Sequence, residues 1–161
     1  MKSWFRKVKE TVVSALKQGW SLREVCWSTA WGVTVGIFPI YGVTTAALGL
    51  MGVVWKLNHA VMQAFNYLVS PLKFALILPY IRLGEWMFRE TDPFSLSVPE
   101  FARRFRDAPM ETLGEFAMTF VHAISGWAVT LPIWLVAVYG VMYLVIRAGE
   151  STRAHIEEVR T

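Results

Sequence analysis

The segment GIFPIYG, Gly36–Gly42, lies near the centre of 31 consecutive uncharged residues, Val25–Trp55. About 18 apolar residues already suggest a helix that spans a membrane. Pro39 lacks a backbone N–H and disfavours helical backbone in the residue before it, and the flanking glycines relax the chain further. A single straight helix through this point is therefore not expected.

The uncharged run instead predicts two short helices. The 14 residues before Pro39 and the 16 after it reach only about 21 and 24 Å at 1.5 Å per residue, short of a hydrocarbon core of about 30 Å. A re-entrant hairpin or a tight pair of short helices fits these lengths. We assign this first hairpin to residues 21–57, and Ser21 with Glu24 has the spacing of a capping box that would start it.

Residues 58–88 repeat this plan, because an apolar stretch after Asn58 is interrupted at Pro71 and then continues. Pro39 and Pro71 are 32 residues apart and hold corresponding places in two units of similar length, as in the internal repeats of transporters. The sequence therefore predicts a second proline-broken hairpin, re-entrant or short.

The flanking segments complete a single all-α membrane domain over residues 1–161. Residues 1–20 alternate apolar and basic side chains at helical spacing, which indicates an interfacial amphipathic helix or, in the alternative, a helix packed on a core. Residues 89–115 carry three prolines and many charges, which predicts a surface segment. Residues 116–147 predict one C-terminal transmembrane helix, and residues 148–161 a polar tail.

Composition agrees with a bilayer environment. Hydrophobic residues make up 55% and charged residues 17% of the chain, against about 45–50% and about 25% in soluble domains. The net charge of +4 comes from basic residues that flank apolar runs, so it suits anionic lipid headgroups and not nucleic acid. Cys26 is the only cysteine, which excludes an internal disulfide.

The positive-inside rule predicts the orientation. If each hairpin returns to its starting side, the N-terminus and residues 89–115 share the cytoplasm, and a single C-terminal crossing places the tail outside. With Lys73 buried, twelve Lys and Arg then lie inside and three outside. Bends at Gly126 and Pro132 leave open a third hairpin, which would return the tail to the cytoplasm.

The stretch GVTVGIFPIYGVTTAALGL resembles the bacterial family called domain of unknown function 2062, whose members carry a glycine-bounded Phe-Pro-x-x-Gly-x-x-Thr segment. The resemblance continues through KLN, Lys56–Asn58, and SPLKFALILPYIRLG, Ser70–Gly84. Ser70 and Lys73 depart from the family's usual Asn and Thr. The resemblance implies a small inner-membrane protein of unassigned activity, sometimes fused to glycosyltransferase domains, and it supplies no catalytic residues.

The two breaks are the best candidates for a functional site. Non-helical backbone inside a bilayer is tolerated only where protein buries it or where it lines a wet cavity. Half-helix N-termini with polar side chains would there suit a phosphate or carboxylate. The competing interpretation is that Pro and Gly only let short helices pack closely. The candidate substrate-binding residues are Gly36, Pro39, Gly42, Thr44, Thr45, Asn66, Ser70, Pro71 and Lys73.

Ionisable side chains follow Pro71 in the second hairpin. They need charged partners or water, since placing one such charge at the bilayer centre costs at least about 2.5 kcal/mol. Arg82 and Glu85 are three residues apart and predict a structural ion pair. We expect Lys73 to face a hydrated cavity with an anionic partner. Ser70 and Lys73 match a Ser-x-x-Lys hydrolase spacing, but Pro71 lies inside it, so we expect no enzyme.

No metal or cofactor is expected, because neither His59 nor His122 has a second ligand at metal-binding spacing. The leading hypothesis is transport or translocation of a small anionic or lipid-linked substrate by a homo-oligomer in contact with membrane lipids. The alternative hypothesis is a non-catalytic interaction subunit for a membrane-associated glycosyltransferase or another envelope enzyme.

Overall fold

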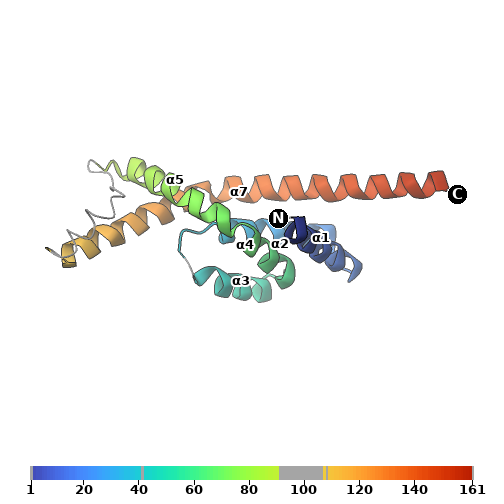
Figure 1. Ribbon diagram of the computed structural model, residues 1–161, viewed down its shortest axis with the longest axis horizontal. Helices are drawn as coiled ribbons and strands as arrows, with labels where there is room; N and C mark the ends of the chain where they lie inside the picture. Colours follow the sequence, from blue (N-terminus) through green and yellow to red (C-terminus); the bar gives the residue numbers. More distant parts are fainter. Residues whose placement is uncertain (1, 41, 91–106, 108, 161) are drawn as a thin grey trace.

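The computed structural model describes residues 2–40, 42–90, 107 and 109–160, and helices connected by turns make up this part of the chain. The predicted all-α fold is confirmed. The long helix α7 runs the length of the molecule, with α1–α4 along one side of it and α5 crossing its N-terminal part (Figure 1). The helices are α1 Lys2–Lys17, α2 Leu22–Gly36, α3 Val43–Val54, α4 His59–Leu68, α5 Ser70–Phe88 and α7 Pro109–Arg160.

The GIFPIYG segment separates two short helices, α2 and α3, as the sequence predicts. The predicted capping box starts α2, since Ser21 Oγ accepts from Glu24 N at 3.2 Å and Glu24 Oε2 accepts from Ser21 N at 2.8 Å. Gly42, with φ +86°, precedes α3. Glycine adopts this left-handed conformation without the penalty that a side chain would bring, so the chain can turn sharply into α3.

The second unit differs from the predicted hairpin. The break falls at Val69, and Pro71 lies in the first turn of α5, where its missing N–H costs no hydrogen bond. The axes of α4 and α5 differ in direction by 65°. The two arms diverge, since α4 packs mainly on α2 and α5 on α7. This unit is therefore a bent helix pair and not two arms lying side by side.

Helices α2 and α4 lie side by side and run in the same direction. Their contacts recur every four residues with a constant offset of 30 residues, and the α2 members are all small. A Cβ atom added at Gly32 would lie 2.6 Å from Met62 O, so the two backbones approach more closely than any side chain allows. The contacts pair Ser28 with Asn58, Gly32 with Met62 and Gly36 with Asn66.

Helix α7 is antiparallel to α5 and crosses it closely. A Cβ atom at Gly84 would overlap the His122 carbonyl, and one at Gly126 would overlap the Tyr80 carbonyl. The helix continues through Pro132 without a break, and it includes the predicted polar tail. It also includes residues 109–115, the end of the predicted surface segment. The rest of that segment, residues 91–106 and 108, lies outside the described residues.

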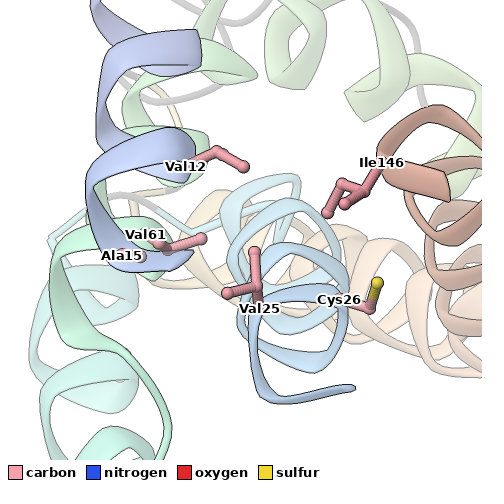
Figure 2. Packing of buried hydrophobic residues seen from close by; sticks show 6 residues of the cluster. All are labelled: Val12, Ala15, Val25, Cys26, Val61 and Ile146. Atoms are coloured by element: carbon pink, nitrogen blue, oxygen red, sulfur yellow. The ribbon is translucent and has the colours of Figure 1, made fainter. Parts of the chain in front are cut away.

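One stretch of α7, Ala117–Gly149, is 33 residues long and apolar enough to cross a membrane, and only 6% of its most apolar window is buried. The buried hydrophobic residues gather instead where the shorter helices meet. Figure 2 shows one such cluster, in which α1 packs against the start of α2 and α4, near the end of this apolar stretch. Its members are Val12, Ala15, Val25, Cys26, Val61 and Ile146. The predicted N-terminal helix therefore exists and is attached to the bundle.

Candidate functional site

A group of polar side chains joins the starts of α3 and α5 to α4. Gln63 Nε2 donates to Thr45 O at 3.1 Å, and Asn66 Nδ2 donates to Gln63 Oε1 at 3.2 Å and to Thr45 Oγ1 at 3.5 Å. Ser70 Oγ donates to Asn66 O at 3.2 Å. These four residues, Thr45, Gln63, Asn66 and Ser70, are called the polar cluster below. The two breaks of the chain thus meet at one place.

Gly36, the last residue of α2, makes room for the polar cluster. A Cβ atom there would lie 2.6 Å from Val69 Cγ2 and 3.3 Å from Asn66 Oδ1. Any side chain at this position would push α2 away from the break between α4 and α5. The partial negative charge of the α2 C-terminus consequently lies beside Asn66, which is buried.

Lys73 is buried, with 3% of its surface exposed, one turn after Ser70 on α5. Burial of an ammonium group is expensive, so its position among the mostly apolar residues of α5 demands compensation from polar surroundings. Of the other predicted site residues, Pro39 and Thr44 are buried near the first break, whereas Gly42 and Pro71 are exposed. The structure therefore brings Gly36, Thr45, Asn66 and Ser70 together and leaves Gly42 and Pro71 as turn and cap residues.

A second connection, which the sequence reasoning missed, holds the first break to α7. Trp127 Nε1 donates to Thr34 O at 2.9 Å, and the Trp127 ring lies edge-on to Phe38 with centroids 4.8 Å apart. The hydroxyl groups of Thr29 and Thr34 are buried without a hydrogen-bond partner among the described residues. Gln63 was also missed as a site residue, although its three-residue spacing from Asn66 on one helix face offered a signal.

The remaining ionisable groups lie away from the polar cluster. Arg82 Nη1 is 2.8 Å from Glu85 Oε2, and Arg82 is half-exposed while Glu85 is buried. His59 is exposed at the start of α4, whereas His122 is buried beside Phe88 at the crossing of α5 and α7. Among the residues that the structure describes, no three His, Cys, Asp or Glu side chains are grouped as metal ligands.

An open groove of about 430 Å³ lies between α1 and α4. Most of its lining residues are polar, and it lies beside the N-cap of α4, where Asn58 Oδ1 accepts from Val61 N at 3.0 Å. The lining residues are Glu10, Thr11, Ser14, Ala15, Gln18, Asn58 and Ala60. None of them was a candidate from the sequence.

A family model described as an uncharacterized protein conserved in bacteria (DUF2062) matches residues 5–155. This match covers nearly the whole chain, including all six described helices in whole or in part. No curated protein and no solved structure matches the chain. The resemblance predicted from the FPIYGVTT motif is confirmed, and the chain belongs to this bacterial family of uncharacterised proteins.

Proposed function

We propose that this protein is an integral protein of the bacterial inner membrane that binds a small anionic or lipid-linked substrate at the polar cluster and supports its translocation. The observation that carries the proposal is the burial of Lys73 one helical turn after Ser70, a member of the polar cluster at which both breaks of the chain meet. Amide and hydroxyl groups beside an ammonium group suit a phosphate or a carboxylate.

The exposed surface supports the membrane placement. A core helix of a soluble protein is mostly buried, whereas the apolar window of α7 is almost entirely exposed. Apolar side chains on α3 and α5 are exposed as well, including Val53 at 79%, Phe74 at 65% and Trp86 at 77%. Lipid acyl chains are the environment in which such a surface is stable.

The short lengths of α2 and α3 support a polar binding site within the bilayer. With 15 and 12 residues, α2 and α3 extend only about 22 and 18 Å, which is less than a hydrocarbon core of about 30 Å. Helices of this length end inside the membrane when they start at its surface. The start of α5 then brings a helix N-terminus to the polar cluster, and its partial positive charge favours an anionic substrate group there.

Reconstitution of the purified protein tests this function. We expect binding of a polyprenyl phosphate or an anionic phospholipid, measured by native mass spectrometry, and its movement between leaflets of proteoliposomes. Lys73→Met should lower binding at least about tenfold, the effect of losing about 1.4 kcal/mol, and Asn66→Leu should weaken it too. Arg89→Met, which removes the same charge from an exposed position just after α5, is the matched control.

Unchanged binding in folded Lys73→Met protein would remove Lys73 from the site. If the wild type neither binds nor moves either lipid, and instead copurifies stoichiometrically with a membrane glycosyltransferase, the interaction-subunit hypothesis replaces the transport hypothesis. Circular dichroism and gel filtration of each variant separate loss of binding from loss of fold.

A further inference from the structure

Five aromatic residues of α2, α7 and the end of α3 form two groups of neighbouring rings. The ring centroids of Trp31 and Trp55 are 4.9 Å apart, and those of Trp27 and Tyr139 are 4.8 Å apart. Trp27 and Trp31 are one turn apart on α2, and Tyr139 stacks on Tyr143 of α7 at 6.5 Å. These residues, Trp27, Trp31, Trp55, Tyr139 and Tyr143, are called the aromatic row below. Four of them are partly buried, and Trp55 is 49% exposed.

A basic side chain lies at each end of the aromatic row. Arg147 Cζ lies 5.5 Å from the Tyr143 ring centroid, and Lys56 directly follows Trp55; both basic residues are exposed. Exposed apolar side chains adjoin them, with Val54 at 63% and Leu144 at 67%. Partly wet aromatic rings between cations and apolar surface are typical of the level at which lipid headgroups meet acyl chains.

Helix α1 marks the same end of the molecule. It packs on the start of α2 in the cluster that also holds Ile146, and it is drawn beside the C-terminal half of α7 in Figure 1. The end of α5 lies elsewhere, since Phe88 contacts His122. His122 and Ile146 are 24 residues apart, or about 36 Å of helix, which exceeds the hydrocarbon core of about 30 Å.

We propose that the aromatic row and α1 form a surface that binds anionic headgroups of the cytoplasmic leaflet, so that both chain ends are cytoplasmic and the connection from α5 to α7 is outside. The inference rests on the membrane placement proposed above and on no particular substrate. Among the described residues other than the buried Lys73, ten Lys and Arg lie on the α1 side and two, Arg82 and Arg89, on the α5 side, as the positive-inside rule requires. This arrangement replaces the predicted one, in which the N-terminus shared a side with residues 89–115.

Labelling of single cysteines in a Cys26→Ala background tests the topology. In intact spheroplasts, an impermeant maleimide should modify Glu90→Cys, and it should modify Ser3→Cys and Thr161→Cys only after lysis. Any other pattern in membrane-embedded protein overturns the proposal. Release of the wild type by alkaline carbonate would instead overturn the membrane placement itself, so the two failures are distinguishable.

Titration with phosphatidylglycerol tests the headgroup surface. The lipid should raise the melting temperature of the protein in detergent, and Lys56→Gln should need about fivefold more lipid for half the rise, as loss of one basic residue near an anionic surface implies. Arg89→Gln is a matched control, because Arg89 (φ +54°) and Lys56 (φ +53°) share a left-handed backbone at opposite ends of the bundle. The proposed headgroup surface would be wrong if the two variants needed equal amounts of lipid, or if the lipid did not raise the melting temperature of the wild type.

Discussion

Substitution of Gly84 by alanine tests the closest helix crossing in the structure. The added Cβ atom would overlap the His122 carbonyl, a backbone group that cannot rotate away, so α5 and α7 must move apart. Overpacking of this kind costs about 1–3 kcal/mol. The matched control is Gly140→Ala in α7, whose Cβ atom would meet nothing within 4 Å.

The control separates packing from helix propensity. Both variants gain the propensity of alanine over glycine, about 1 kcal/mol, so the difference between them reports the crossing alone. We expect Gly84→Ala to be less stable than Gly140→Ala by about 1–3 kcal/mol, measured by reversible unfolding in mixed micelles with increasing denaturing detergent.

A double variant sharpens this test. Gly126→Ala meets the Tyr80 carbonyl at the same crossing and should destabilise the protein by a similar amount. Since separation of the helices by one substitution relieves the other, the effects of Gly84→Ala and Gly126→Ala together should be less than additive. Equal stability of Gly84→Ala and Gly140→Ala would refute the close crossing, and strict additivity would show that the two glycines do not share one contact.

Three further substitutions probe the supports of the site. Ser28→Ala removes the acceptor, 2.9 Å away, for the buried Asn58 N–H, and it should cost about 1–3 kcal/mol in the same unfolding assay because that group is left unpaired. Trp127→Phe keeps an aromatic side chain, although a smaller one, and loses the hydrogen bond to α2. We expect it to lower the free energy of unfolding by at least about 0.5–1.5 kcal/mol, and an unchanged stability would show that this hydrogen bond does not hold α7 to α2. The hydroxyl and backbone N–H of Ser21 hold the pKa of Glu24 below its usual value. Stability from this pair is therefore complete above the usual Glu pKa of about 4.3 and is lost as pH falls through the lower folded-state pKa; the loss should be absent in Glu24→Gln.

The sequence predicted the helices more successfully than their partners. Pro39 and its glycines correctly located the break between α2 and α3, because their effect on the backbone is local. Pro71 located the second break only to within two residues, since proline is also favourable in the first turn of a helix. The parallel packing of α2 on α4 was not foreseen, because small residues spaced by four give the same pattern whichever helix covers them.

For the candidate site too, the sequence predicted residues beside the breaks but not the contacts between distant segments. Thr45, Asn66 and Ser70 were candidates because they flank the breaks, and the structure joins them. Trp127 was not a candidate, yet its indole N–H donates a hydrogen bond to Thr34 O of α2, 93 residues away. A contact at that sequence distance depends on the tertiary arrangement and leaves no local pattern.

The length of α7 has a consequence for the choice of bilayer. Its apolar stretch of 33 residues measures about 50 Å, against a hydrocarbon core of about 30 Å. In the proposed membrane arrangement this positive hydrophobic mismatch is relieved by tilting of the helix or by local thickening of the lipid. Since α2 and α5 are attached to α7, a change of tilt moves the polar cluster as well. Acyl-chain length therefore becomes a variable that acts on the site, and reconstitutions in lipids of different thickness are not equivalent.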